Sequence, residues 1–219
     1  MDRQPEPLGG ALAGRRFYLC TPDRADLPQF VDACIKGGVD IVQYRDKQGD
    51  ARSVLKRGAL VRDVCRSHGV PFILNDRPDL AFELGADGVH VGQDDCPPST
   101  ARRILGPNAI IGLSTHSQDD MIGSEREPVD YISVGPVNPT PTKPGRPGTG
   151  LGYLRYAVDN APVPYYVTGG VNPHSIGDLL GSGATRFVAV RWLTEADDPF
   201  EAAKLLRRAI DTGRPLKRS

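Results

Sequence analysis

The stretch Gly85-Ala86-Asp87-Gly88-Val89-His90-Val91-Gly92-Gln93 contains the end of a helix, a short apolar strand and a polar loop in immediate succession. Helices commonly end on glycine, which readily takes the left-handed backbone conformation that closes the last turn. A glycine followed within a few residues by an apolar run also occurs at Gly37-Gly38 and at Gly183-Ala184. This recurrence predicts one helix-to-strand turn that the chain uses several times.

Short apolar runs occur along the whole chain, with amphipathic stretches between them. Near-continuous hydrophobicity in a short run is typical of a strand that is buried on both faces. The predicted strands are 17–20, 41–43, 72–74, 89–91, 110–113, 131–134, 165–167 and 187–190. Three stripes at helical spacing predict helices that cover the sheet: Leu27, Val31, Cys34 and Ile35; Val54, Val61, Val64 and Cys65; and Ala202, Leu205, Leu206 and Ala209.

Helix starts are predicted from capping residues. Asp198-Pro199 with Glu201 has the order of an N-cap, a first-turn proline and a capping partner. Asn172-Pro173 predicts a second helix start of the same kind.

Alternating strands and helices are compatible with a closed (β/α)8 barrel or an open doubly wound sheet. The segment Cys20-Thr21-Pro22-Asp23 after the first strand lacks the glycine pattern of a dinucleotide-binding fold. We therefore predict a single-domain (β/α)8 TIM barrel over residues 15–212. The flanking segments, 1–14 and the basic end 213–219, are expected to be flexible.

Composition limits the possible partners. Lys plus Arg and Asp plus Glu number 27 each among 219 residues, so no excess charge favours nucleic acid or an anionic membrane. Cys20, Cys34, Cys65 and Cys96 have no C-x-x-C spacing and are expected to be reduced thiols of a cytoplasmic protein. No signal-peptide core and no run of 18 apolar residues is present. Small-molecule substrates are expected, and a homo-oligomer is left open.

Charged residues follow several of the predicted strands. Arg45 and Lys47 project from Gln43-Tyr44-Arg45-Asp46-Lys47, whereas Asp76 and the pair Asp94-Asp95 follow the next two strands. Barrel active sites lie at the C-terminal ends of the strands, where these residues would meet. Cations suit a pyrophosphate, and carboxylates suit a hard divalent ion such as magnesium. The pattern therefore predicts a metal-bound diphosphate site, although spacing does not decide between Asp94 and Asp95.

In this order the motifs resemble those of the thiamine-phosphate synthase family. The matching stretches are Gln43-Tyr44-Arg45-Asp46-Lys47, Asn75-Asp76-Arg77, residues 85–93 with Asp95, Ile111-Gly112-Leu113-Ser114-Thr115-His116, Val134-Gly135-Pro136, Pro139-Thr140-Pro141-Thr142-Lys143 and Gly169-Gly170-Val171-Asn172. They extend over nearly the whole chain, and only the ordered set is specific. The resemblance implies a magnesium-dependent transferase that joins a hydroxymethylpyrimidine diphosphate to a thiazole phosphate and releases pyrophosphate.

The resemblance also assigns site residues. It places the pyrimidine diphosphate on Gln43, Tyr44, Arg45, Asp46, Lys47, Asn75, Ser114 and Lys143, with Ser114 and Lys143 as catalytic groups, and one Mg²⁺ on Asp76 and Asp95. It places the thiazole phosphate on Thr140, Pro141, Thr142, Gly170, Val190 and Arg191. At Arg191-Trp192 the chain departs from the smaller polar residues that are usual in the family. Residues 138–150 are expected to form a lid over the substrates.

Two alternatives are open. A thiazole tautomerase on a related barrel would not need the full set of diphosphate and metal residues, and a non-catalytic regulatory barrel would bind precursors without turnover. Magnesium-dependent release of pyrophosphate would exclude both. His90 alternates inward within a strand and is expected to be structural, because no second histidine has metal-ligand spacing.

Overall fold

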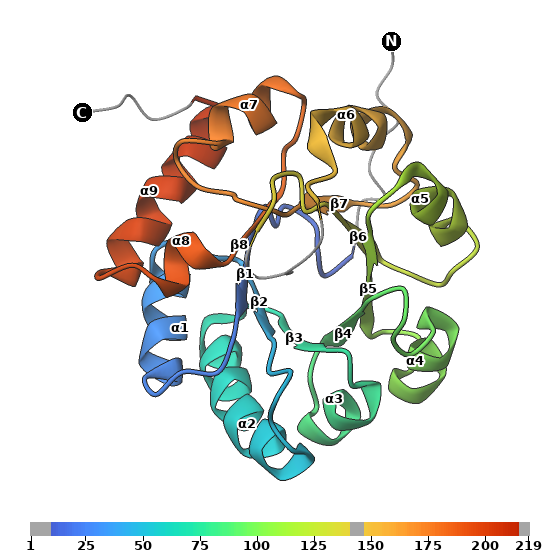
Figure 1. The fold of residues 1–219 in the computed structure, drawn as a ribbon. Coiled ribbons are helices and arrows are strands. Elements are labelled where there is room, and N and C mark those ends of the chain that lie inside the picture. Colours follow the sequence, from blue (N-terminus) through green and yellow to red (C-terminus); the bar gives the residue numbers. More distant parts are fainter. Residues whose placement is uncertain (1–9, 141–146, 215–219) are drawn as a thin grey trace.

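A computed structural model describes residues 10–140 and 147–214 of the chain. Its eight parallel strands form a closed barrel in sequence order, with β8 pairing with β1 (Figure 1). The strands are β1 Phe17–Thr21, β2 Ile41–Tyr44, β3 Phe72–Asn75, β4 Gly88–Val91, β5 Ile110–Thr115, β6 Tyr131–Val134, β7 Tyr165–Val167 and β8 Phe187–Ala189. All eight strands predicted from the apolar runs are therefore confirmed, and the barrel is closed.

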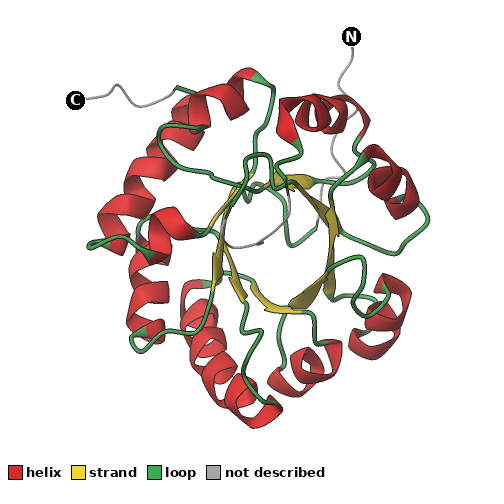
Figure 2. Ribbon diagram, viewed as in Figure 1, coloured by secondary structure: helices red, strands yellow, loops and turns green. Residues whose placement is uncertain are grey.

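Helices surround the barrel on the outside (Figure 2). They are α1 Leu27–Lys36, α2 Ala51–His68, α3 Pro78–Leu84, α4 Pro98–Leu105, α5 Gln118–Ser124, α6 Gly150–Asn160, α7 Ile176–Gly181, α8 Arg191–Thr194 and α9 Pro199–Thr212. The three apolar stripes lie on α1, α2 and α9, although Leu205 of the third stripe is 41% exposed and does not cover the sheet. The prediction of a single-domain (β/α)8 TIM barrel is confirmed. None of the helices within the described ranges is long and apolar enough to cross a membrane.

The alternation of side chains along each strand divides the core into two clusters. In β2, Val42 and Tyr44 pack outward in the cluster beneath the helices. Ile41 packs inward with the rings of Tyr18 and Tyr131. Successive side chains of a strand point to opposite faces, so each strand contributes to both clusters. Inward positions of the strands, together with the loops that follow them, can therefore reach a site at the mouth of the barrel.

The predicted flanking segments are only partly described. Residues 1–9 and 215–219 lie outside the described ranges. Within the expected flexible segment 1–14, Leu12 is 8% exposed and packs in the inner cluster with Tyr18 and Ile41. This leucine contributes to the core of the barrel.

The two predicted helix starts behave differently. The Asp198 side chain accepts a hydrogen bond from the amide of Glu201 at 3.1 Å, with Pro199 in the first turn, as predicted. The Asn172 side chain accepts from the amides of His174, at 2.7 Å, and Ser175, but α7 begins only at Ile176. The carbonyl of Asn172 also accepts a hydrogen bond from the amide of Ile176 at 3.0 Å, so the predicted capping contacts are present, and the regular helix begins four residues after the asparagine.

Candidate functional site

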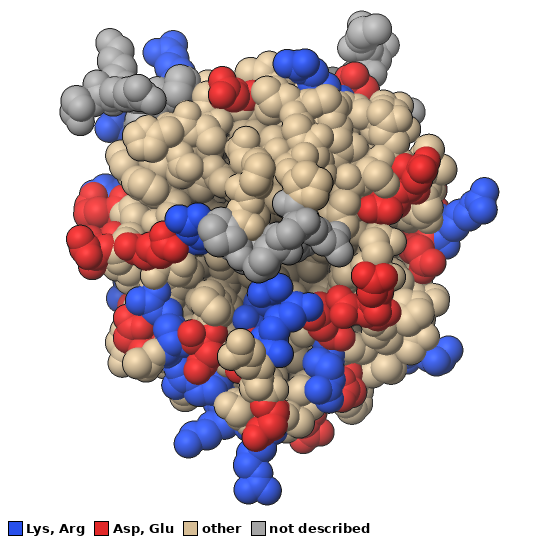
Figure 3. All heavy atoms as spheres, viewed as in Figure 1, with Lys and Arg blue, Asp and Glu red and all other residues tan. Residues whose placement is uncertain are grey.

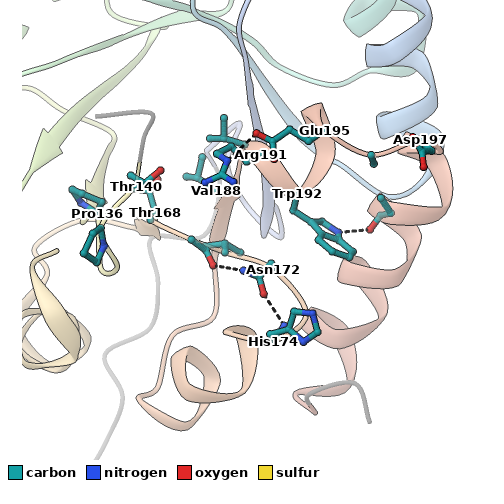
Figure 4. A pocket seen from close by; sticks show the side chains of 17 residues that line it. Pro136, Thr140, Thr168, Asn172, His174, Val188, Arg191, Trp192, Glu195 and Asp197 are labelled. Atoms are coloured by element: carbon teal, nitrogen blue, oxygen red, sulfur yellow. Dashed lines mark hydrogen bonds and ion pairs between the residues drawn. The ribbon is translucent and has the colours of Figure 1, made fainter. Parts of the chain in front are cut away.

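Two cavities adjoin at the C-terminal ends of the strands. The first has a volume of about 400 Å³ and is lined mainly by β2 to β6 and the loops that follow them. The second, of about 510 Å³, is lined by the loops after β6, β7 and β8 (Figure 4). Thr168, Val188 and Val190 line both. The structure thus offers neighbouring spaces for two ligands at one mouth of the barrel.

The first cavity brings together the charged residues expected at a diphosphate and metal site. Arg45, Lys47, Asp76 and Asp95 all line it, although they come from three different loops. The Nζ of Lys47 lies 2.6 Å from Oδ2 of Asp76. Figure 3 shows the face of the molecule viewed in Figure 1, and basic and acidic side chains lie side by side just below the centre of that face. The predicted convergence of cations and carboxylates is therefore present.

Asp76 is held in an unusual backbone conformation at the end of β3. Its φ of 63° lies in the left-handed region, and its amide donates to the carbonyl of His90 in β4 at 2.8 Å. A non-glycine residue in this region costs on the order of 1 kcal/mol or more, and such residues cluster at functional sites. This backbone geometry directs the carboxylate toward Lys47 and Asp95.

Burial is the main cause that raises the pKa of Asp76, and the neighbouring Asp95 carboxylate raises it further, whereas Lys47 opposes both effects. Oδ2 of Asp95 accepts a hydrogen bond from the amide of Gly92 at 2.9 Å, which fixes the carboxylate beside Asp76. Asp94 also lines the cavity but has no such part in the environment of Asp76. The structure thus pairs Asp76 with Asp95, the aspartate that the family resemblance selected.

Tyr44 and Asp46 are not among the residues that line either cavity. The Tyr44 ring is fully buried beneath the helices, and burial raises the pKa of its hydroxyl, which donates to Asp23 at 3.3 Å. Oδ1 of Asp46 accepts from the amides of Gln48 and Gly49, at 3.0 and 2.8 Å. Both side chains support the loop that presents Arg45 and Lys47, and contact with a substrate remains a prediction.

The floor of the first cavity is made of polar side chains inside the barrel. Gln43 and Ser114, which the sequence analysis assigned to the pyrimidine diphosphate, lie on this floor, and Asn75, assigned to the same ligand, lines the wall. Residues that line this cavity and were not assigned to the site from the sequence include Tyr18, Cys20, His90, Tyr131, Ser133 and Thr168. Alternation within the strands was the available signal for Tyr18, Cys20, His90, Tyr131 and Ser133, which occupy inward positions of β1, β4 and β6, whereas Thr168 directly follows β7.

His90 and His116 both line this cavity. Both ring nitrogens of His90 form hydrogen bonds at 2.9 Å, Nδ1 with the hydroxyl of Tyr131 and Nε2 with that of Ser114, which agrees with the expected structural role. Nδ1 of His116 bonds the carbonyl of Gly135 in the next loop. His90 therefore connects β4 to β5 and β6, and His116 connects the loops that follow β5 and β6.

The second cavity depends on close contact between the loops after β6 and β7. The amide of Val137 donates to the carbonyl of Thr168 at 2.8 Å, and the side chain of Asn138 donates to the carbonyl of Gly169 at 3.2 Å. A Cβ atom at Gly169 would lie 2.6 Å from Cα of Pro136, so only glycine allows this approach.

Four of the six predicted thiazole phosphate residues line the second cavity: Thr140, Gly170, Val190 and Arg191. Arg191 opens α8 and forms an ion pair with Glu195 at 2.9 Å, with its side chain 51% exposed (Figure 4). The other two, Pro141 and Thr142, and the predicted catalytic Lys143 lie outside the described residues.

No group of three or more His, Cys, Asp and Glu side chains gathers as a metal centre in the part of the chain that the structure describes. Asp76 and Asp95 form a pair of carboxylates beside two cations. Magnesium takes one or two protein carboxylates and completes its shell with water and substrate phosphate. The residues present therefore fit a metal that binds together with a phosphorylated substrate.

A closed (β/α)8 barrel with cations, paired carboxylates and two adjoining cavities at its C-terminal mouth belongs to the class of barrel enzymes that act on phosphorylated small molecules. Residues 17–193 match the family model described as thiamine monophosphate synthase. The chain therefore belongs to the thiamine monophosphate synthase family, and it is an enzyme of the transferase class.

Individual relatives agree with this assignment. The chain is 43% identical over 222 residues to a thiamine-phosphate synthase of Mycobacterium sp. (strain KMS), covering 95% of this chain and 98% of the relative. It is 45% identical over 210 residues to that of Thermobifida fusca (strain YX), covering 94% and 96%. The solved thiamine phosphate pyrophosphorylase from Pyrococcus furiosus superposes with a TM-score of 0.83 at 29% identity, covering 90% and 96%. These relatives favour a synthase over the tautomerase and the regulatory barrel.

Proposed function

We propose that the protein condenses a hydroxymethylpyrimidine diphosphate with a thiazole phosphate, giving thiamine monophosphate and pyrophosphate. The observation that carries the proposal is the meeting of Arg45, Lys47, Asp76 and Asp95 in one cavity that adjoins a second. Cations beside paired carboxylates suit a diphosphate that binds with a divalent ion. The adjoining cavity has room for the acceptor substrate.

The pyrimidine diphosphate occupies the first cavity in this proposal. Arg45 can donate two hydrogen bonds to phosphate oxygens, and Lys47 supplies a point charge once it leaves Asp76. Asn75 and Ser114 line the same space and can donate to the ring or the diphosphate. Gln43 lies on the floor, where the pyrimidine would rest. Lys143 lies outside the described residues and stays a prediction.

Asp76 and Asp95 would hold the magnesium ion. Their carboxylates are hard oxygen ligands, and Asp95 is already fixed by the amide of Gly92. Bound there, the ion would supply positive charge to neutralise the leaving pyrophosphate. Lys47 would then be free to take up further negative charge on the diphosphate.

The reaction breaks the bond between the pyrimidine methylene carbon and the diphosphate oxygen, and the electron pair leaves with pyrophosphate. The amino-substituted ring stabilises the resulting cation, and the lone pair of the thiazole nitrogen forms the new carbon–nitrogen bond. No nucleophile from the protein is needed. The chain contributes by orienting both substrates and by binding the charge that grows on the leaving group, which lowers the barrier to reaction.

The thiazole phosphate occupies the second cavity, with its phosphate near Thr140, Gly170, Val190 and Arg191. A guanidinium can fork onto phosphate oxygens, so Arg191 replaces the smaller polar residue usual in the family with a stronger ligand. Pro141 and Thr142 are assigned by resemblance alone. Small molecules are the proposed partners, and the four free cysteines favour the cytoplasm.

Incubation with both precursors and Mg²⁺ tests the proposal. We expect equimolar thiamine monophosphate and pyrophosphate, and no pyrophosphate when Mg²⁺ is chelated. Asp76→Ala should lower turnover at least roughly a hundredfold with an unchanged circular dichroism spectrum, because it removes one of two proposed ligands. Asp63→Ala, which changes an exposed aspartate paired with Arg62 on α2, serves as the matched control. A folded wild-type protein that releases no pyrophosphate would contradict the proposed activity.

A further inference from the structure

A continuous series of hydrogen-bonded side chains crosses the floor of the first cavity. Its members come from β1, β2, β4, β5 and β6, and each is less than 9% exposed. They are Cys20, Gln43, Tyr18, Tyr131, His90, Ser114 and Ser133. We call this series the floor chain. It joins Gln43 on one side of the barrel to Ser114 on the other.

The first half of the floor chain has a defined donor direction. Sγ of Cys20 donates to Oε1 of Gln43 at 3.0 Å, and Nε2 of Gln43 donates to the hydroxyl of Tyr18 at 3.0 Å. The Tyr18 oxygen therefore accepts from the amide, and its own proton is directed elsewhere. The hydroxyl of Tyr131, at 2.8 Å, is placed to accept that proton.

The second half continues in the same direction. With Tyr18 as the donor to Tyr131, the single proton of the Tyr131 hydroxyl is available for Nδ1 of His90, which lies 2.9 Å away. A neutral imidazole carries one proton, and in this direction of donation that proton belongs on Nε2, which lies 2.9 Å from Oγ of Ser114. Ser133 also donates to this oxygen, at 3.4 Å.

Both phenols keep their protons in this arrangement. Burial is the main cause that raises the pKa of Tyr18 and of Tyr131 well above the ordinary value. The rings are also held in place, because Tyr166 packs edge-on against both, at centroid distances of 5.5 and 5.4 Å. The donor direction is thus maintained by groups with little freedom to rearrange.

The direction of the chain decides what Ser114 can do. In this direction its Oγ accepts from His90 as well as from Ser133, which leaves the serine proton to point into the cavity. We propose that Tyr18, Tyr131 and His90 are positioning residues that hold Ser114 as an obligatory hydrogen-bond donor to the substrate, with His90 in the Nε2–H tautomer. The group recognised is a hydrogen-bond acceptor on the pyrimidine diphosphate, and this consequence rests on the proposed function.

The tautomer can be tested without any turnover. Nitrogen NMR of protein labelled in its four histidines, at mildly alkaline pH, separates protonated from bare ring nitrogens. The His90→Gln variant identifies the His90 signals by their loss. We expect a bare Nδ1 and a protonated Nε2 in the wild-type protein. A protonated Nδ1 with a bare Nε2 would overturn the proposal whether or not the protein makes thiamine monophosphate.

Tyr131→Phe and Tyr18→Phe test the positioning role. With Phe at position 131, Nδ1 loses its donor, so Nε2 of His90 can accept from Ser114 and withdraw the serine proton from the cavity. We expect the tautomer to shift toward Nδ1–H and kcat/KM for the pyrimidine diphosphate to fall roughly ten- to a hundredfold. Tyr18→Phe should shift the His90 tautomer and kcat/KM in the same directions but by smaller amounts, because Tyr131 keeps its own proton.

Tyr165→Phe is the matched control, since Tyr165 is a largely buried tyrosine of β7 whose hydroxyl bonds the carbonyl of Gly183 outside the floor chain. It should change neither the tautomer nor kcat/KM. An active Tyr131→Phe variant with wild-type kcat/KM would show that the floor chain merely satisfies buried polar groups. If the wild-type protein made no thiamine monophosphate, that result would count against the proposed function, whereas the tautomer measurement would still stand.

Discussion

Lys47 occupies the position beside Asp76 from which a metal ion would displace it. The ion pair is short, at 2.6 Å, but the side chain of Lys47 is 48% exposed and that of Asp76 20% exposed. Solvent screening limits half-exposed pairs of this kind to about 0.5–1 kcal/mol. Metal binding must break this pair, so the pair weakens the affinity of the protein for Mg²⁺ alone.

Lys47→Met is expected to have opposite effects on two ligands. Without substrate, loss of the competing cation should tighten Mg²⁺ binding about twofold to fivefold, which corresponds to about 0.5–1 kcal/mol. With Mg²⁺ present, pyrophosphate should bind about ten- to a hundredfold more weakly, because a charged hydrogen bond worth about 1.5–3 kcal/mol is lost.

Isothermal titration calorimetry with Mg²⁺, and then with pyrophosphate at saturating Mg²⁺, measures both affinities. Lys204→Met is the control, because Lys204 forms a comparable exposed pair with Glu201 at 2.9 Å on α9. It should alter neither affinity. Weaker binding of Mg²⁺ alone to Lys47→Met would refute the idea that this lysine competes with the metal for Asp76.

Three further outcomes are expected. A Cβ at Gly112 would lie 2.1 Å from Cζ of Tyr131, so Gly112→Ala should lower the free energy of unfolding by about 1–3 kcal/mol in urea titrations and reduce kcat/KM; an unchanged stability would count against this tight packing. Burial raises the pKa of the Cys34 and Cys65 thiols from 9.0 to about 12, so their contribution to stability should be complete below pH 9 and lost as pH rises toward about 12. Urea midpoints measured across that pH interval test this expectation. In the double variant with alanine at positions 34 and 65, the midpoint should decline less steeply with pH. Asp198→Ala should lower the free energy of unfolding by about 1 kcal/mol in thermal denaturation, because the α9 cap is lost. Asp198→Asn should retain most of the wild-type stability, because asparagine can still accept the capping hydrogen bond.

Much of the site was predictable because strand order and strand ends are local features. A residue in the loop after a strand lies at the mouth of a barrel, whatever the details of core packing. Arg45, Asp76 and Asp95 are in such loops, and they line one cavity as expected. Residues inside the strands were harder to assign. Gln43 and Tyr44 are adjacent in sequence, yet one lies on the cavity floor and the other beneath the helices.

The sequence by itself determined the eight strands, the covering helices and the loops that carry charge, since these follow from apolar periodicity and from glycine, proline and capping residues. Only the tertiary structure decided which side chains meet across the barrel. Tyr18 and Tyr131 are 113 residues apart in sequence, and their hydroxyls are 2.8 Å apart because closure of the barrel sets the register of every strand against its neighbours. The series of hydrogen bonds from Gln43 to Ser114 also depends on that closure, because its members come from different strands.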